Sequence, residues 1–113
     1  MSADPVQSHL AQLVQSHPVV LFMKGTPSAP QCGFSYAVAN VLEHYEVPVH
    51  AVNVLADPEI REGVKAFSNW PTIPQLYVKG EFVGGCDIVR EMFQAGELQS
   101  FLVEKGVSVK GAA

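Results

Sequence analysis

Cysteine, cationic residues and long apolar runs are all scarce in this sequence of 113 residues. Two cysteines cannot form the disulfide framework that stabilises small secreted domains, so the composition favours a reducing compartment. Seven lysines and arginines against eleven acidic residues give a net charge of −4. This charge argues against a nucleic-acid partner, because phosphate binding needs a cationic surface. No apolar run approaches the roughly 20 residues of a transmembrane helix, so we expect no membrane span.

The N-terminal region also lacks the features of a targeting peptide. Residues 1–17 contain no arginine and include Asp4, whereas signal and transit peptides carry basic residues. Two localisations therefore stay open: the cytoplasm, or an organelle if a transit peptide has been removed. We find no internal repeat or linker, and 113 residues are enough for a single domain. We expect a core over about residues 6–105 and a loose C-terminal tail over 106–113.

The spacing of apolar residues and the helix-capping residues predict nine elements. Helices are expected from Asp4 to before Pro18, after Cys32, from Asp57 to about Phe67, from Asp87 to Met92 or Phe93, and over 97–105. Strands are expected over 19–23, 48–54, 75–78 and 82–83. The βαβ unit implies parallel neighbours and the later hairpin implies antiparallel ones. The predicted fold is therefore α/β and thioredoxin-like, with a four-stranded mixed sheet flanked by helices on both faces.

Cys32 has the clearest chemical role in the sequence. It lies between the apolar strand 19–23 and a predicted helix, where unpaired N–H groups and the positive end of the helix dipole gather. That environment favours the thiolate, which is both the nucleophile and the metal ligand of cysteine chemistry. Position 35 is a serine, so this loop offers one activated sulfur and no local second thiol.

Three motifs, taken in order, resemble those of the monothiol glutaredoxins. They are Lys24-Gly25-Thr26-Pro27 with Cys32-Gly33-Phe34-Ser35, Trp70-Pro71-Thr72-Ile73-Pro74-Gln75, and Gly84-Gly85-Cys86-Asp87. The resemblance extends from about residue 19 to residue 102, and it is closest to the single-domain subgroup. It implies a single glutaredoxin domain over residues 1–113 that binds glutathione.

The resemblance assigns the glutathione site to residues from all three motifs and from one further helix: Lys24, Arg61, Thr72, Ile73, Pro74, Gly85, Cys86 and Asp87. Glutathione carries two carboxylates, an ammonium group and amide linkages, so cations, a helix N-terminus, a carboxylate and exposed backbone all suit it. The resemblance also implies a cis peptide bond before Pro74, although trans is the ordinary expectation. Trp70 fits either a wall of the binding cleft or a partly exposed core aromatic, and Phe34 fits either a shield of the cluster or glutathione or a core residue.

Simpler roles stay open for several of these residues. Lys24 and Arg61 also fit solvated surface cations, and Asp87 also fits a cap for its own helix. Cys86 fits two roles. One is that of a small, partly buried residue, and the other is that of a resolving thiol that forms a disulfide with Cys32.

Two functions follow from the resemblance. The first is binding and transfer of a 2Fe–2S cluster in iron–sulfur protein assembly, with Cys32 and a glutathione thiolate as ligands in each of two subunits. The implied partners are a homodimer in the cluster-bound state, apo iron–sulfur proteins and a BolA-like protein, in the mitochondrial matrix or the cytoplasm. The second is a glutathione-dependent thiol–disulfide oxidoreductase that removes glutathione from proteins through Cys32 alone. The Gly33-Phe34 pair favours the first, with at most weak oxidoreductase activity.

Overall fold

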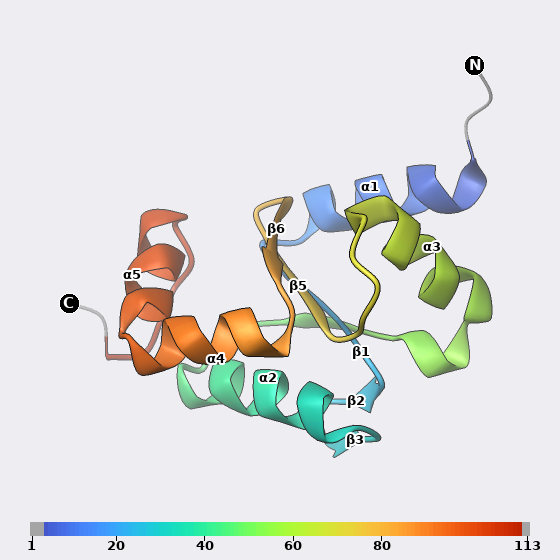
Figure 1. Ribbon diagram of the computed structural model, residues 1–113. Helices are drawn as coiled ribbons and strands as arrows, with labels where there is room; N and C mark the ends of the chain where they lie inside the picture. Colours follow the sequence, from blue (N-terminus) through green and yellow to red (C-terminus); the bar gives the residue numbers. More distant parts are fainter. Residues whose placement is uncertain (1–3, 112–113) are drawn as a thin grey trace.

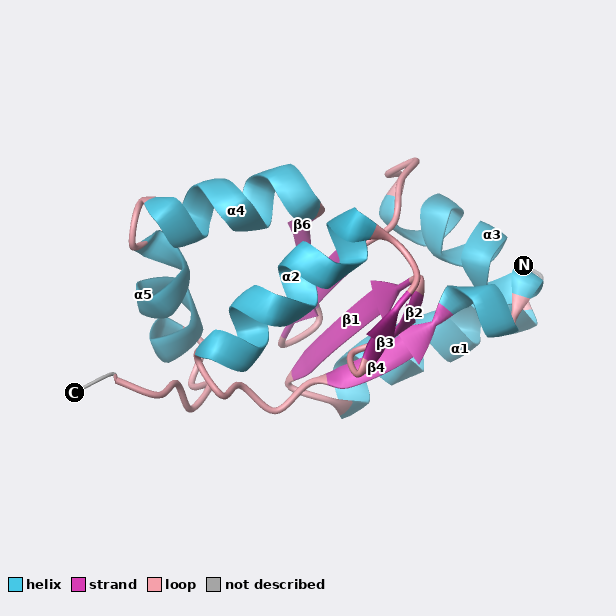
Figure 2. Ribbon diagram, turned by 90° about the horizontal axis from the view of Figure 1, so that it is seen from below, coloured by secondary structure: helices cyan, strands magenta, loops and turns pink. Residues whose placement is uncertain are grey.

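A four-stranded mixed sheet lies at the centre of the computed structural model, which describes residues 4–111 (Figures 1 and 2). The strand order is β4-β1-β5-β6. β1 (Val19–Met23) pairs in parallel with β4 (His50–Asn53) and antiparallel with β5 (Gln75–Val78). β5 then pairs antiparallel with β6 (Glu81–Gly84). This arrangement confirms the predicted thioredoxin-like fold.

Helices cover both faces of the sheet (Figure 1). α1 (Pro5–Ser16) and α3 (Pro58–Ser68) pack against each other on one face. α2 (Gly33–His44) and α4 (Cys86–Gln94) pack together on the opposite face, and α5 (Glu97–Glu104) contacts α4. No helix among residues 4–111 is both long and apolar enough to cross a membrane.

The continuous apolar run of β1 is explained by the two helical layers. Val19, Leu21 and Met23 belong to the core cluster on the side of α2, whereas Val20 and Phe22 belong to the cluster on the side of α1. All five side chains are buried, because alternate residues of a strand point to opposite faces and both faces are covered here.

Capping residues set the starts of two helices as the sequence predicted. The Asp4 carboxylate accepts a hydrogen bond of 2.9 Å from the N–H of Val6 at the start of α1. The Asp57 carboxylate accepts from Glu59 and Ile60 at the start of α3. These bonds satisfy N–H groups that have no partner within the helix.

Two predicted boundaries were wrong. Asp87 is not the cap of its helix: α4 begins at Cys86, Gly85 takes the N-cap position, and Asp87 lies in the first turn. β4 covers only His50–Asn53, not residues 48–54, because Val54 already belongs to a short 3₁₀ helix, η1 (Val54–Ala56).

The C-terminal segment is not the loose tail that the sequence predicted for residues 106–113. Val107 and Val109 are buried in the core cluster beneath α2 and α5. The N–H of Lys110 donates a hydrogen bond of 2.8 Å to the carbonyl of Tyr45, and its ammonium group pairs with Glu46. The segment is therefore docked as far as Lys110; residues 112 and 113 lie outside the described part of the chain.

Candidate functional site

A short hairpin places Cys32 at the start of α2. β2 (Gly25–Thr26) and β3 (Ala29–Pro30) pair antiparallel directly after β1, and Cys32 follows as the N-cap residue of α2. Gly25 has a φ of +92°, and a Cβ at this position would lie 2.5 Å from the carbonyl oxygen of Ala29, so the turn requires glycine. The sequence did not predict this hairpin.

The environment of Cys32 favours its ionised form. The backbone N–H of Ser35 contributes most to lowering the pKa of the Cys32 thiol, which partial desolvation opposes. The N–H of Phe34, the charge of Lys24 and the Ser35 hydroxyl lower this pKa further. The thiol makes no capping hydrogen bond to the helix, so the N–H groups act on it as nearby dipoles. Because the thiol is partly exposed, an incoming sulfur or metal can reach it.

Ser35 also ties the end of β1 to the start of α2. Its side chain is fully buried, and its hydroxyl oxygen accepts a hydrogen bond of 3.0 Å from the N–H of Lys24. In sequence, Ser35 drew attention only as the position without a second cysteine. The structure gives it a positive role that only a long-range contact reveals.

A cleft of about 190 Å³ brings six of the predicted glutathione residues together. Three of them come from the loop before β5 and three from the start of α4. The full lining is Phe34, Trp70, Thr72, Ile73, Pro74, Gly85, Cys86, Asp87 and Ile88. The Ile73–Pro74 peptide bond is cis, as the family resemblance implied. The N-terminus of α4 opens into the cleft, which gives it N–H donors for an anion.

Lys24 and Arg61 do not line this cleft. Lys24 follows β1, and its charge acts on the Cys32 thiol. Arg61 lies in the first turn of α3, where its N–H bonds to the carbonyl of Asp57. Its Nε is buried and has no hydrogen-bond partner among residues 4–111. Both cations therefore require a ligand that extends beyond the cleft if they are to contact it.

The two aromatic residues of the site are exposed. Phe34 is 61% exposed and Trp70 is 39% exposed, and both line the cleft. Their place in the lining supports the interpretation as walls of the site, and the partial burial of Trp70 also agrees with a partly exposed core aromatic. Trp70 also packs on the ring of Phe82, with ring centroids 6.1 Å apart.

The two cysteines differ in environment. Cys86 is buried, and this burial raises the pKa of its thiol, to which the nearby Cys32 contributes as well. Arg90, one helical turn further on, opposes the effect. Both thiols are free, and the two alternatives for Cys86, a small buried residue or a resolving thiol for Cys32, both stay open.

Comparison with known proteins identifies this arrangement. A family model for glutaredoxin matches residues 19–83, which is more than half of the chain. The chain belongs to the glutaredoxin family. This glutaredoxin is 64% identical over 92 residues to mitochondrial monothiol glutaredoxin-5 of Lachancea kluyveri, covering 79% of this chain and 64% of that protein. It is 54% identical to a monothiol glutaredoxin of Synechocystis, covering 85% of this chain and 90% of that one. These relatives confirm the predicted monothiol glutaredoxin family.

Other relatives are much longer than this glutaredoxin. The chain spans 22% of monothiol glutaredoxin-S11 of rice and 23% of monothiol glutaredoxin-S17 of Arabidopsis thaliana. Among solved structures, a monomeric truncated mutant of Trypanosoma brucei 1-C-Grx1 matches with a TM-score of 0.87 at 41% identity, covering 97% of this chain and all of that one. A buckwheat glutaredoxin–glutathione complex matches with a TM-score of 0.78 at 25% identity, covering 89% and 90%.

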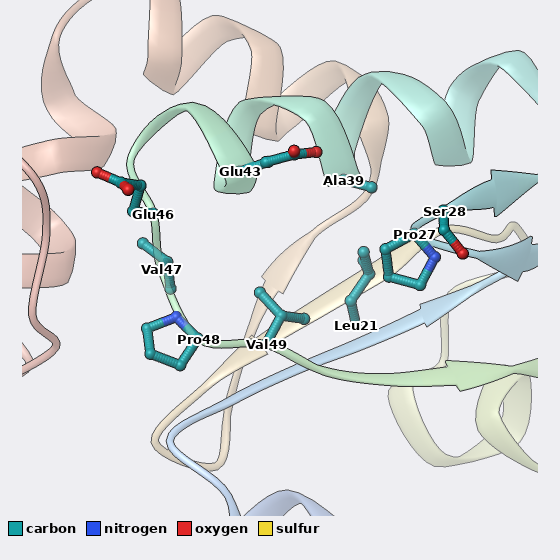
Figure 3. Close-up of a pocket in the computed structure, with 9 residues that line it drawn as sticks. All are labelled: Leu21, Pro27, Ser28, Ala39, Glu43, Glu46, Val47, Pro48 and Val49. Atoms are coloured by element: carbon teal, nitrogen blue, oxygen red, sulfur yellow. The ribbon is translucent and has the colours of Figure 1, made fainter.

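A larger hollow of about 490 Å³ lies apart from the chemistry of this glutaredoxin, beneath α2 (Figure 3). None of the predicted site residues lines it. Figure 3 shows the carboxylate of Glu46 pointing away from the hollow, and this carboxylate pairs with Lys110 at 3.2 Å. The smaller cleft, which is lined by six of the predicted residues including Cys86 but not by Cys32 itself, is therefore the candidate site.

A metal site within a single chain is not formed by the described residues. Among residues 4–111, no group of three or more His, Cys, Asp or Glu side chains could hold a metal ion. Cys32, a partly exposed thiol whose pKa is lowered, has the character of a metal ligand. Such a thiol suits a site whose other ligands come from outside the chain.

Proposed function

We propose that this glutaredoxin binds reduced glutathione at the cleft and, as a glutathione-bridged pair, holds and transfers a 2Fe–2S cluster. The observation that carries the proposal is Cys32: one thiolate-favoured, partly exposed sulfur at a helix N-terminus, with a buried serine where a second cysteine would stand. A 2Fe–2S cluster needs four ligands, which are usually thiolates. Two copies of Cys32 and two glutathione thiolates supply these four.

Glutathione would bind between the two walls of the cleft, which are the loop before β5 and the start of α4. The backbone of Thr72 and Ile73 would pair with the extended peptide, with the turn set by Pro74. The N–H groups at Cys86 and Asp87, at the start of α4, suit the γ-glutamyl carboxylate. The solved buckwheat glutaredoxin–glutathione complex has the same fold, which supports a site for the tripeptide in this one.

Charged side chains would hold the two ends of glutathione. Lys24 and Arg61 would receive the glycine carboxylate where the ligand extends beyond the cleft, since neither lines it. The exposed carboxylate of Asp87 is available to the γ-glutamyl ammonium group, since it makes no cap. Gly85 has no side chain, so the peptide backbone can approach closely.

The cluster would be cargo and not a permanent cofactor. When bound, it supplies the iron–sulfur unit that an apo iron–sulfur protein accepts, and half of its ligands belong to an exchangeable small molecule. Cys32 would hold it at the surface, where an acceptor protein or a BolA-like heterodimer partner can approach. Several relatives are mitochondrial by name, which supports the mitochondrial matrix as one location beside the cytoplasm.

A second function, weak thiol–disulfide exchange, is favoured by the lowered pKa of Cys32. The Cys32 thiolate would attack the glutathione sulfur of a glutathionylated protein and release the protein thiolate. A second glutathione thiolate would then attack the Cys32–glutathione disulfide, releasing glutathione disulfide and the free Cys32 thiolate. This cycle needs one protein thiol only.

Anaerobic reconstitution with iron, sulfide and glutathione tests the first function. We expect the wild-type protein to become brown and to elute as a dimer in gel filtration, and only when glutathione is supplied. Cys32→Ser should remain colourless and monomeric. Ser28→Ala, which changes an exposed serine of the neighbouring hairpin turn, is the matched control and should behave as wild type. A stable cluster on the Cys32→Ser variant would show that the ligand assignment is wrong.

A further inference from the structure

Gln75 is a fully buried polar residue beside the cleft but not in its lining. Its Nε2 donates hydrogen bonds to the carbonyl oxygens of Trp70, at 3.1 Å, and Thr72, at 3.2 Å. Its Oε1 accepts a bond of 3.2 Å from the Tyr77 hydroxyl. One side chain therefore reaches from the centre of the sheet into the loop that forms one wall of the cleft.

The hydrogen-bonding groups of a glutamine side chain match the partners available here in number and kind. A primary amide offers two N–H donors and a carbonyl acceptor, and all three find partners here. Glutamate has the same shape but no donor when ionised, and leucine has neither donor nor acceptor. A buried polar group that loses its partners costs folding free energy, so either replacement leaves the loop carbonyls unpaired or displaced.

Few other hydrogen bonds fix the loop held by Gln75, although Ile73 is buried in the core and Trp70 packs on Phe82. Residues 69–74 form no helix or strand. The N–H of Trp70 is held by the carbonyl of Lys65 and by the Ser68 hydroxyl, which anchor only the first part of the loop. Gln75 is the contact that holds the carbonyls of both Trp70 and Thr72 from the side of the sheet.

The loop also touches the opposite wall of the cleft. A Cβ at Gly85 would lie 3.2 Å from the carbonyl oxygen of Pro74 and 3.4 Å from Nε1 of Trp70. The two walls are thus in close contact at this point. A shift of the loop by a few tenths of an ångström would change the distance between the backbone at Thr72 and the N-terminus of α4.

We propose that Gln75 is a positioning residue, which sets the spacing between the two walls of the cleft and through it the affinity for glutathione. The inference rests on the proposed function for its ligand. Gln75 does not itself contact the ligand; it fixes the carbonyls of the loop so that the neighbouring N–H groups point into the cleft. This role belongs to the interior of the sheet and leaves the Cys32 thiol unchanged.

Titration of the ¹⁵N-labelled protein with reduced glutathione, followed by NMR, tests the inference. We expect Gln75→Leu to weaken glutathione binding about tenfold, because two hydrogen bonds to the loop are lost. The amide signals of Trp70, Thr72 and Ile73 should shift in the free protein, whereas the pH profile of Cys32 alkylation should stay as in wild type. Gln7→Leu is the control: it removes the same kind of bond, 2.9 Å to the Gly63 carbonyl, far from the cleft.

A second variant, Gln75→Glu, gives a signature that a merely structural role would not give. Burial raises the pKa of a carboxyl group, and the protonated form regains one donor. Its glutathione affinity should therefore recover toward the wild-type value as the pH falls from about 8 to about 5. If Gln75→Leu fails to fold, the pH dependence of glutathione binding by Gln75→Glu tests the inference by itself. An affinity of Gln75→Glu equal to that of wild type at every pH would overturn the inference.

The two proposals fail in different ways. If the wild-type protein shows no saturable shifts with glutathione, the proposed function is wrong, and the loop signals of the free variants still decide the role of Gln75. If the amide signals of Trp70, Thr72 and Ile73 are unchanged in Gln75→Leu, the positioning role is wrong whether or not glutathione binds. Shifted signals with unchanged affinity would equally contradict it.

Discussion

The reactivity of Cys32 depends on a few atoms around its sulfur. The largest contribution comes from the Ser35 backbone N–H, which any residue at position 35 except proline retains. The Ser35 hydroxyl adds a smaller contribution and also holds the N–H of Lys24. Substitution at position 35 should therefore modulate the thiolate without abolishing it.

Alkylation of Cys32, followed by peptide mass spectrometry, measures this effect. Because only the thiolate reacts, the rate should rise with pH around a midpoint below the ordinary thiol value of 9.0, while the midpoint for Cys86 should lie above it. Ser35→Ala should slow Cys32 alkylation at neutral pH roughly threefold, because the contribution of the Ser35 hydroxyl to the lowered pKa is lost. Ser28→Ala should leave the rate unchanged. A Ser35→Ala midpoint equal to that of wild type would exclude the hydroxyl as a contributor.

Among single residues, the sequence predicted those with chemistry of their own, such as Cys32. It missed those that act by positioning other residues, such as Ser35 and Gln75. Cys32 and the cleft residues could be named because a local motif places each of them. The roles of Ser35 and Gln75 depend on hydrogen bonds to Lys24 and to the loop of Trp70, which arise only when distant segments meet. Neither the periodicity of apolar residues nor the spacing of motifs indicates such hydrogen bonds.

One close approach between helices depends on glycine, at the contact of α1 with α3. A Cβ on Gly63 would lie 2.5 Å from Cγ1 of Val6 and 3.5 Å from Cδ1 of Leu10. Alanine normally stabilises a helix relative to glycine by up to about 1 kcal/mol. Here the added methyl group would force the two helices apart, and overpacking of this kind costs typically about 1–3 kcal/mol.

Gly63→Ala should therefore lower the free energy of unfolding by about 1 kcal/mol or more, despite the gain in helix propensity. Urea denaturation followed by circular dichroism gives the value. Gly33→Ala is the matched control, since a Cβ at this helical glycine meets nothing within 4 Å, and its stability should equal or exceed that of wild type. A Gly63→Ala protein more stable than wild type would show that the helices can separate at little cost.

Elements with strong local sequence signals were predicted, whereas elements that depend on tertiary contacts were not. The caps at Asp4 and Asp57 and the apolar run of β1 are local, and the structure has them where expected. Each strand of the β2–β3 hairpin is only two residues long. The Asn53 side chain holds the hairpin in part by accepting a hydrogen bond from the N–H of Gly25. A local sequence pattern does not indicate this contact between distant residues.

For the molecule as a whole, stability at alkaline pH should depend on Tyr77. Burial raises the pKa of Tyr77 to about 12, against an ordinary value of 10.0. Between these values the folded protein keeps a proton that the unfolded chain releases, so the free energy of unfolding falls as the pH rises from about 10 toward 12. The full loss is at most roughly 2–3 kcal/mol.

Chemical denaturation at a series of alkaline pH values measures this slope. Tyr77→Phe should remove the part of the slope that Tyr77 contributes, although its stability at neutral pH is lower through the lost bond to Gln75. Tyr36→Phe, which changes an exposed tyrosine, should keep the wild-type slope. Equal slopes for wild type and Tyr77→Phe would show that the phenol is ionised in the folded protein as readily as in the unfolded chain.

The docked C-terminal segment has a consequence for trimming by exopeptidases. A carboxypeptidase must draw an extended chain end into its active site, and Lys110 is held by a backbone bond to Tyr45 with Val109 buried beside it. Digestion of the folded protein should therefore stall near Lys110, whereas a free tail would be shortened as far as Gly106. Intact mass spectrometry during digestion would reveal the difference. The docking of residues 107–110 would thus limit how far the chain of 113 residues can be shortened.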